Sequence, residues 1–387
     1  MKLAIFCSTP NFRGIHQYSL YLSRLSREIF ANSYLRPNSS AWKFNKTLRF
    51  VSQIIWELFP GNAKDQADVE IYSSPRLPLR AFFGDQIRPL RGLVLLDFIQ
   101  YVDLSSPKNL IDVCLIFGLH EFVKRIVHTA YCNISLRRAN FVIIISSFTN
   151  STFSERLPRQ AIRLAERSLI LHPAPSFTRN SVLQALQSIP LRSYSQPVTV
   201  HVVTGSLPSK HPALLQACLA CLKAKAAQQE IKFIVNVFGY SSLALSVLNS
   251  SNFSVNCNPK SVPESDLIQS YLLSDLFLST SSQEGFGIPL LDSILFDLCC
   301  ITTPIDPFCE IANAYRPLSN TVYFSSTYDI SVADQMASLI MKASRSFVFR
   351  SPKQKAQAYI DASETIFASA QERLAGFLEH QFLTCSR

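Results

Sequence analysis

The segment Ser279 to Asp292 reads STSSQEGFGIPLLD and decides the fold. An apolar run precedes it, made of Leu272, Leu273, Leu276, Phe277 and Leu278. The run leads into a polar turn that contains Glu284 and two glycines, and a new apolar period begins at Ile288 and Pro289. This order predicts a buried strand that passes through a glycine turn into a helix.

The turn has the properties of an anion-binding site. Gly285 and Gly287 allow backbone N–H groups to approach a ligand closely, and a proline at the helix start needs no donor of its own. The free N–H groups and positive dipole end of such a helix suit a phosphate or diphosphate. Glu284 and Asp292 are eight positions apart. We expect one carboxylate at the mouth of the turn and the other about two helical turns further down the same face. The alternative is an ordinary turn with a solvated Glu284.

This stretch resembles the signature of the family 4 glycosyltransferases of the GT-B fold, in which a Glu, seven residues and a second Glu surround a glycine turn. In this chain the second carboxylate is Asp292, one methylene shorter. The resemblance implies that Glu284 binds the hydroxyls of the transferred sugar and that Asp292 binds the ribose. It also implies donor contacts from the backbone of Gly14, Gly285, Phe286, Gly287 and Ile288.

A second motif begins at the strand pattern Val198 to Val203, followed by TGSLPSKHP and a helical period. It resembles the family's opening of the second domain, a glycine turn with a Lys just before a helix, and Lys210 is the residue carried over. A compact ammonium there would neutralise the diphosphate as the leaving group gains charge. The Arg that often stands beside this Lys is absent, with Ser206 and Ser209 in the candidate places.

The first half resembles the family less closely. Lys2 to Ser8 predicts a strand, and TPNFRG after it resembles the family's first glycine loop, with Gly14 kept and Arg13 in place of the other glycine. The strand ending in LLDFIQ has Leu96 where the family commonly has an aromatic side chain. This strand most resembles the mannosyltransferase-like branch.

Composition restricts the class of protein. The chain has 387 residues, of which 48% are hydrophobic and 17% charged, with a net charge of +10, so we expect a globular protein with an acidic partner. Scattered basic residues without a recognition motif argue against nucleic acid. The ten cysteines lie mostly in apolar segments and predict a reduced, cytoplasmic protein. No signal peptide or membrane span is recognisable, so any membrane contact would be peripheral. The basic helical pattern 111–138 could make this contact; alternatively, its basic residues form a solvated helix face.

Alternating strand and helix patterns in both halves predict an α/β protein with parallel sheets. The resemblance implies the GT-B fold, in which two Rossmann-like parallel-sheet domains face each other across a cleft. It implies an acceptor-side domain at residues 1–180, a donor-binding domain at 195–360 and a C-terminal helix, 361–387, that packs back on the first domain; the polar segment 177–196 predicts a linker between the domains. No GxGxxG motif is present, which argues against a nicotinamide or flavin cofactor.

The resemblance implies a retaining glycosyltransferase with Lys210 and Glu284 in the catalytic site, without a cofactor or bound metal. It would move a hexose, with mannose as first candidate, from a nucleotide-diphosphate sugar to a saccharide or lipid-linked acceptor, in polysaccharide or glycoconjugate biosynthesis. The departures at Arg13, Leu96, Ser209 and Asp292 leave an alternative, in which a non-catalytic relative uses the fold to bind a glycan or a partner protein.

Overall fold

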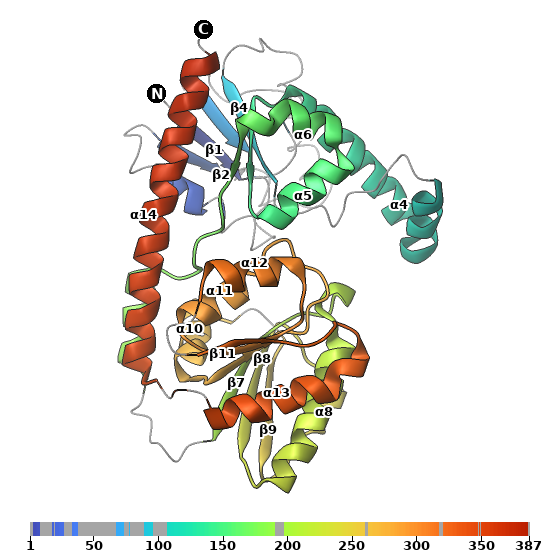
Figure 1. The fold of residues 1–387 in the computed structure, drawn as a ribbon, viewed down its shortest axis with the longest axis vertical. Coiled ribbons are helices and arrows are strands. Elements are labelled where there is room, and N and C mark those ends of the chain that lie inside the picture. Colours follow the sequence, from blue (N-terminus) through green and yellow to red (C-terminus); the bar gives the residue numbers. More distant parts are fainter. Residues whose placement is uncertain are drawn as a thin grey trace. The chain divides into compact units, whose positions relative to one another are not determined.

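The computed structural model describes residues 3–7, 18, 20–26, 33–37, 67–72, 77, 89–95, 107–189, 197–259, 262–316, 320–346, 348 and 350–385. The chain divides into two compact units. The first contains Met1–Ala174 and Phe367–Arg387, and the second contains Pro175–Ile366. Each unit is built on a parallel sheet with helices around it (Figure 1), which confirms the predicted fold class.

The first unit contains a six-stranded parallel sheet in the order β2-β1-β3-β4-β5-β6. The strands are β1 (Leu3–Cys7), β2 (Ser33–Pro37), β3 (Val69–Tyr72), β4 (Leu90–Leu95), β5 (Phe141–Ile144) and β6 (Ser168–Ile170). The described helices that follow β4 and β5 are α4 (Pro107–Arg138), α5 (Ser147–Arg156) and α6 (Pro158–Leu164). The strand predicted at 2–8 is therefore present as β1, with each bound shifted by one residue.

Local chemistry explains these elements. All four residues of β5 are buried, as expected for a strand in a parallel sheet covered on both faces. Gly92 lies opposite Phe141 in the register, and a Cβ at Gly92 would come within 2.1 Å of the Phe141 ring. The absence of a side chain on β4 thus makes room for an aromatic ring on β5. Helix α5 starts at Ser146, whose hydroxyl accepts a hydrogen bond from the Thr149 amide at 3.0 Å.

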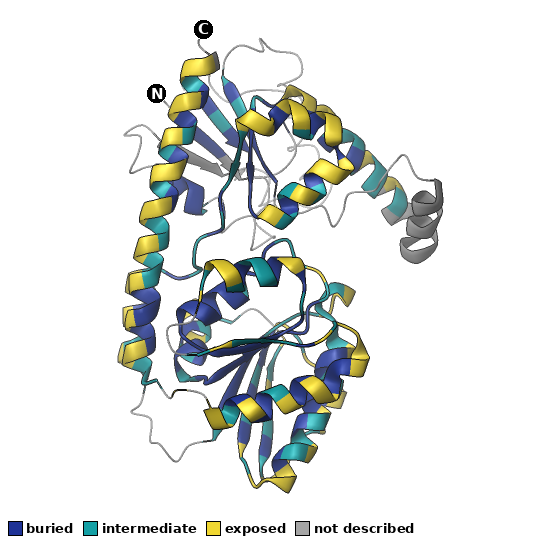
Figure 2. Ribbon diagram, viewed as in Figure 1, coloured by how far each residue is buried: buried dark blue, intermediate teal, exposed yellow. Residues whose placement is uncertain are grey.

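The last helix, α14 (Pro352–Cys385), begins nine residues before the C-terminal helix predicted at 361–387. Its second half belongs to the first unit. There the Arg373 guanidinium donates to the Ile170 carbonyl at 2.6 Å, and the ring of Phe377 lies edge-on to Phe141 with centroids 5.6 Å apart. Buried, intermediate and exposed residues alternate along the helix in Figure 2, as expected for a helix with one face on a core.

The second unit contains a six-stranded parallel sheet in the order β12-β11-β10-β7-β8-β9. Its strands are β7 (Val198–Val203), β8 (Phe233–Phe238), β9 (Phe253–Asn258), β10 (Leu276–Leu278), β11 (Cys299–Thr302) and β12 (Val322–Phe324). Its α-helices, besides the first part of α14, are α7 (Arg179–Gln187), α8 (Pro212–Gln228), α9 (Leu243–Ser246), α10 (Glu264–Leu273), α11 (Ile288–Leu295), α12 (Asp306–Ala314) and α13 (Ala333–Ser346).

This strand order is that of a dinucleotide-binding Rossmann sheet, with β7 as the first strand and β10 as the fourth. Helices α8 and α13 pack against each other and cover one face, where they join the main apolar core, while α10, α11 and α12 lie on the other face (Figure 1). The order of strands therefore reverses between β7 and β10.

Two local predictions were wrong in detail. Leu272 and Leu273 end helix α10 and do not belong to the strand, which is only Leu276–Leu278. The segment 177–196, for which we predict a linker, contains helix α7, which packs against α10. The Thr178 hydroxyl accepts a hydrogen bond from the Ser181 amide and caps this helix, and Val182 and Ala185 are buried.

In the described part of the chain, no helix combines the length and the apolar character needed to cross a bilayer.

Candidate functional site

The candidate site lies where the strand order of the second sheet reverses. Strands β7 and β10 are neighbours, with Val202 paired to Leu278 near their carboxyl ends. The loop 204–211 leaves β7 towards α8, and the loop 279–287 leaves β10 towards α11. The two helices lie on opposite faces of the sheet (Figure 1), so the two loops leave the sheet at its topological switch point, which is where ligands bind in open α/β sheets.

Hydrogen bonds join the two loops to each other. The Ser282 amide donates to the Ser209 carbonyl at 2.8 Å, and the Thr280 hydroxyl donates to the Lys210 carbonyl at 3.1 Å. On the other side, the Ser279 amide donates to the Ile301 carbonyl of β11 at 3.0 Å. The polar run before Glu284 therefore fixes the position of the backbone that carries Lys210.

Lys210 and Glu284 form an ion pair across the two loops, between Nζ and Oε1. The same carboxylate oxygen accepts a hydrogen bond from the Ser281 hydroxyl at 2.9 Å. The side chains of Lys210 and Glu284 are 26% and 17% exposed, so both charges remain accessible from solvent. A cation and an anion that were predicted separately, 74 residues apart in sequence, therefore meet at one place.

The backbone after Lys210 takes an uncommon conformation. His211 has φ 48° and ψ 58°, in the left-handed region, and its ring Nδ1 accepts a hydrogen bond from the Leu214 amide at 3.2 Å. His211 thus serves as the N-cap of α8, with Pro212 in the first turn. This confirms the predicted Lys just before a helix, since Lys210 lies two residues before the start of α8.

The glycine turn matches the prediction for Gly287. This residue has φ +111°, and a Cβ there would come within 2.5 Å of the Phe308 ring on α12. Both the conformation and the space therefore require glycine. Gly287 is the N-cap of α11, and no side chain caps the first turn of that helix. Phe286 is 3% exposed, so its ring belongs to the core, whereas Gly285 and Ile288 are half-buried.

Asp292 lies in a different environment from Glu284. The spacing predicts that Asp292 lies two helical turns below Glu284 on a common face. Helix α11 begins only at Ile288, however, so Asp292 is about one turn inside the helix and the prediction is wrong. Its side chain is buried, and the carboxylate accepts hydrogen bonds from three groups: the Ser176 amide at 2.9 Å, the Ser176 hydroxyl at 2.5 Å and the Tyr359 hydroxyl at 3.0 Å. Burial raises the pKa of Asp292 to about 6 against the effect of these hydrogen bonds.

Three positions named in the sequence analysis lie outside the described residues: Arg13, Gly14 and Leu96. The sequence analysis missed the role of Ser281 as a partner of Glu284 and of Thr280 as a link between the loops. The signal for both was the run STSS directly before Glu284, since a cluster of hydroxyls in a loop is available for hydrogen bonds to neighbouring backbone and carboxylate groups.

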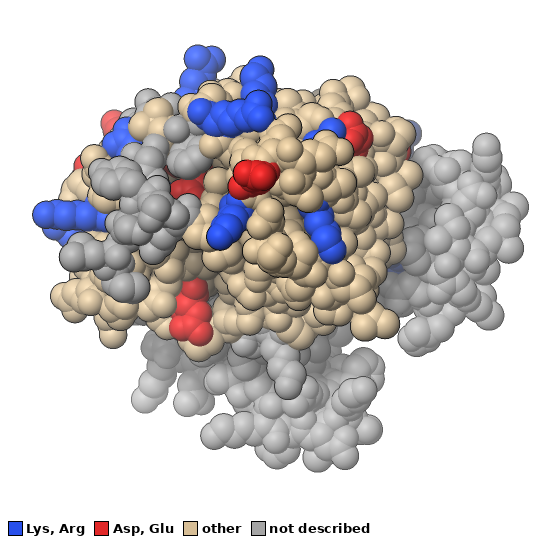
Figure 3. All heavy atoms as spheres, turned by 90° about the horizontal axis from the view of Figure 1, so that it is seen from below, with Lys and Arg blue, Asp and Glu red and all other residues tan. Residues whose placement is uncertain are grey.

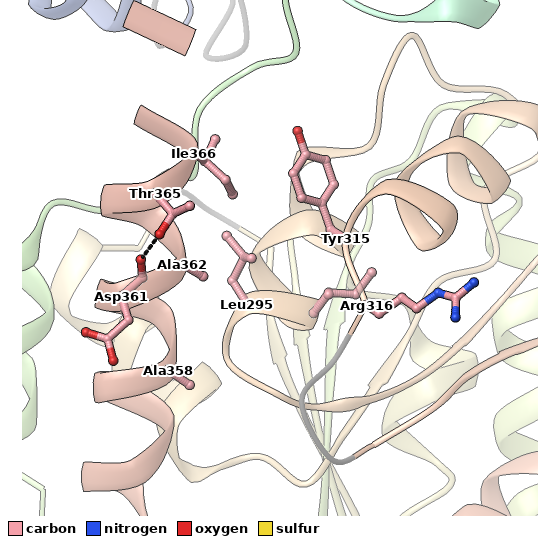
Figure 4. Close-up of a pocket in the computed structure, with 9 residues that line it drawn as sticks. Leu295, Tyr315, Arg316, Ala358, Asp361, Ala362, Thr365 and Ile366 are labelled. Atoms are coloured by element: carbon pink, nitrogen blue, oxygen red, sulfur yellow. Dashed lines mark hydrogen bonds between the residues drawn. The ribbon is translucent and has the colours of Figure 1, made fainter. Parts of the chain in front are cut away.

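A pocket lies elsewhere in the second unit (Figure 4). It has a volume of about 410 Å³ and is lined by Ile294, Leu295, Tyr315, Arg316, Ala358, Asp361, Ala362, Thr365 and Ile366. It adjoins the C-terminal end of α11, whereas the glycine turn is at the N-terminal end. The pocket is therefore separate from the Lys210–Glu284 site, and its lining is mainly apolar.

The whole chain has the fold of GT-B glycosyltransferases. It aligns with an E. coli structure titled trehalose-6-phosphate bound with UDP-2-fluoro glucose, with a TM-score of 0.61 and 10% identity over 99% of both chains. An alpha,alpha-trehalose-phosphate synthase (UDP-forming) from Burkholderia vietnamiensis aligns with a TM-score of 0.58 and 8% identity over 98% of this chain and 100% of that one. WaaG, a glycosyltransferase involved in lipopolysaccharide biosynthesis, aligns with a TM-score of 0.54 and 15% identity over 96% and 98%.

At the level of sequence, residues 257–345 match the family of glycosyl transferases group 1. This segment includes Glu284 and the glycine turn, begins after Lys210 and ends before α14. No curated protein sequence matches the chain. The family match and the fold together identify a glycosyltransferase, the class that the sequence analysis predicts.

Proposed function

We propose that the protein is a retaining hexosyltransferase. It moves a sugar from a nucleotide-diphosphate donor to a saccharide or lipid-linked acceptor in polysaccharide or glycoconjugate biosynthesis. The single observation that carries this proposal is the ion pair between Lys210 and Glu284 at the reversal of the strand order, beside the glycine turn. Two structures with the same fold support a nucleotide sugar, since one is titled as bound with UDP-2-fluoro glucose and the other as UDP-forming. Mannose remains the first candidate for the sugar.

The proposed mechanism assigns different tasks to the two charges. The Lys210 ammonium would neutralise the donor diphosphate, which gains negative charge as the glycosidic bond breaks. Backbone amides at Gly285 to Ile288, at the uncapped start of α11, would contribute the positive end of the helix dipole. Glu284 would accept hydrogen bonds from the hydroxyls of the transferred sugar and so orient it.

The ion pair between Lys210 and Glu284 adds a step to this mechanism. Because the Lys210 ammonium is already paired with the Glu284 carboxylate, an incoming diphosphate would compete with that carboxylate for the ammonium. That exchange would release one side of Glu284 for the sugar, while the Ser281 hydroxyl keeps the carboxylate in place. Binding of a diphosphate without a sugar would then leave Glu284 without its main partner.

The proposal is tested by incubating the protein with UDP-, GDP- and ADP-sugars and following nucleotide release with and without simple sugar acceptors. We expect wild type to release the nucleotide from one class of donor and Glu284→Ala to lose this activity. Glu372→Ala, a control that removes an exposed carboxylate from α14, should keep full activity. NMR of the transfer product would show the anomeric configuration of the donor retained. Donor binding without any release would instead favour the non-catalytic alternative.

We also propose a cytoplasmic protein that contacts the inner face of a membrane peripherally. Three apolar side chains of α4, Val123, Val127 and Ile134, are 50%, 62% and 49% exposed, and their spacing places them on one face of the helix. Arg137 and Arg138 end the same helix. This apolar stripe with basic residues at its end suits an anionic bilayer surface. In contrast, the face of the second unit in Figure 3 carries isolated Lys and Arg side chains.

Flotation with vesicles that contain anionic lipid tests this membrane contact. It should be lost in Val123→Glu and in Val127→Glu, and it should be kept in Ile162→Glu, which replaces an exposed apolar residue of α6.

A further inference from the structure

The carboxylate of Asp292 is the centre of a buried hydrogen-bond network in the second unit. Oδ1 accepts from the Ser176 amide and from the Tyr359 hydroxyl, and Oδ2 accepts from the Ser176 hydroxyl. The Tyr359 oxygen in turn accepts from the Phe177 amide at 2.9 Å. The carboxylate therefore accepts three hydrogen bonds from within the protein, and Asp292 is only 2% exposed.

The elements that the network joins have particular places in the chain. Ser176 and Phe177 are among the first residues of the second unit, which begins at Pro175. Tyr359 lies in the part of α14 that precedes Ile366, where the chain leaves the second unit. Asp292 belongs to α11, whose first turn follows Gly287. One carboxylate thus ties the helix behind the glycine turn to the segments by which the chain enters and leaves this unit.

Aromatic packing makes this connection rigid. The Tyr359 ring stacks on Phe296 at 4.1 Å, and Phe296 stacks on Tyr271 at 5.2 Å. Phe177 contacts all three rings, with centroid distances of 5.8 to 6.1 Å. The Tyr359 hydroxyl therefore has little freedom to leave Asp292, and Asp292 has little freedom to turn towards a ligand.

From these contacts we propose that Asp292 is a positioning residue that holds the glycine turn in place and does not touch the donor. The role differs from the ribose contact implied by the family resemblance. It rests on the proposed function only in its assumption that the turn 285–288 binds the donor. The shorter side chain explains the difference, because an Asp at this position reaches Ser176 and Tyr359 within the fold and is covered by them.

The first test asks whether Asp292 touches the ribose. The affinities of wild type and Asp292→Asn for UDP and for 2′-deoxy-UDP are measured by calorimetry. If the protein prefers another base, the ribose and 2′-deoxyribose diphosphates of that base are used instead. A positioning residue leaves the ratio of the two affinities unchanged within about twofold, since the carboxylate makes no contact with the hydroxyl that is removed. A ratio that falls to one in the variant would overturn the proposal.

The second test measures the network itself and needs no activity. Hydrogen exchange followed by mass spectrometry should be about five- to tenfold faster in Asp292→Asn and Tyr359→Phe, in peptides covering 175–178, 285–291 and 352–366. Asp361→Asn, which removes an exposed carboxylate two residues from Tyr359, should leave these rates unchanged. Unchanged exchange at 285–291 in both network variants would also overturn the proposal. If no nucleotide binds wild type, the proposed function fails, while the exchange result still decides whether Asp292 positions the turn.

Kinetics separate positioning from a merely structural role. With the donor identified above, Asp292→Asn should lower kcat by about tenfold or more and change the donor KM by less than twofold, because a displaced turn costs most in the transition state. Asp292→Leu should be more severe than Asp292→Asn, since the Asn side chain can still accept from Ser176 and Tyr359. An equal loss in both variants, or a rise in donor KM with kcat unchanged, would contradict the proposal.

Discussion

The Nζ of Lys210 and the Oε1 of Glu284 form an ion pair between the loops that follow strands β7 and β10. Each residue is predicted from its own motif, and the strand order explains why they meet. In a parallel sheet the carboxyl ends of adjacent strands open onto the same edge, and β7 and β10 are adjacent at the point where the order reverses. Under the proposed function, this pair is the position at which a diphosphate and a sugar would be held together.

Removing either partner tests the strength of this ion pair in the unliganded protein. In a double-mutant cycle of Lys210→Ala and Glu284→Ala, followed by urea unfolding, we expect a coupling free energy of about 0.5–1 kcal/mol, because both side chains are partly exposed. A value near zero would show that the two side chains do not hold each other in solution. The cycle of Lys225→Ala and Asp334→Ala, whose ion pair is more exposed at Asp334, should give a smaller coupling.

Gly287 should tolerate no side chain. Gly287→Ala combines a positive φ with a Cβ 2.5 Å from the Phe308 ring, so we expect the free energy of unfolding to fall by about 2–3 kcal/mol. Gly376→Ala is the matched control within α14, where a Cβ meets nothing within 4 Å. There the helix propensity of alanine should raise stability by about 0.5–1 kcal/mol. Equal effects of the two changes would contradict this description of the glycine turn.

His201 on β7 should make the protein sensitive to acid. Burial lowers its pKa to about 3, from an unfolded value of 6.5, and its Nδ1 lies 2.8 Å from the Ser270 hydroxyl. Since the unfolded chain binds this proton more readily, the stability from neutral His201 is present above about pH 6.5 and is lost as pH falls towards 3. In urea unfolding at a series of pH values, His201→Asn should reduce the fall in the free energy of unfolding between pH 6.5 and pH 3 by a few kcal/mol. His380→Asn, at an exposed position, should leave this fall in place.

Asp292 should produce the opposite slope. Its pKa of about 6 lies above the ordinary value of 3.8, so the folded protein binds the proton more readily than the unfolded chain. The stabilising contribution of protonation is complete below about pH 4 and is lost as pH rises through about 6. The difference in unfolding free energy between wild type and Asp292→Asn should therefore fall by up to about 3 kcal/mol between pH 4 and pH 7 and be flat above it. A difference that rises with pH would show that the hydrogen bonds dominate burial at this carboxylate.

The sequence predicted those parts of the fold that depend on local patterns. The apolar run Val198–Val203, which follows a proline, became a strand, and the helix start at Ile288 lay where the apolar period begins. The apolar run before Ser279 was treated as one segment, although Ser274 and Asp275 separate Leu272 and Leu273, which end α10, from the strand Leu276–Leu278. Apolar character alone does not distinguish a buried helix end from a buried strand.

The parts that sequence reasoning missed depend on contacts between distant residues. Helix α7 has only Val182 and Ala185 buried, too few for a clear period in a polar segment. Asp292 takes its partners from Ser176 and Tyr359, which are 116 and 67 residues away in sequence. The motif spacing places Asp292 on a helix correctly, but nothing local to the motif indicates that two other segments cover the carboxylate.

The most direct measurement of the central claim is a thermal-shift panel of UDP-, GDP- and ADP-sugars on wild type, Lys210→Ala and Glu284→Ala. We predict that one donor class raises the Tm of wild type and that Lys210→Ala loses this stabilisation. In Glu284→Ala the stabilisation by the sugar nucleotide should fall to that of the nucleoside diphosphate alone. The absence of a shift with any donor on folded wild-type protein, or equal shifts in all three proteins, would contradict the assignment of Lys210 and Glu284 to the donor site.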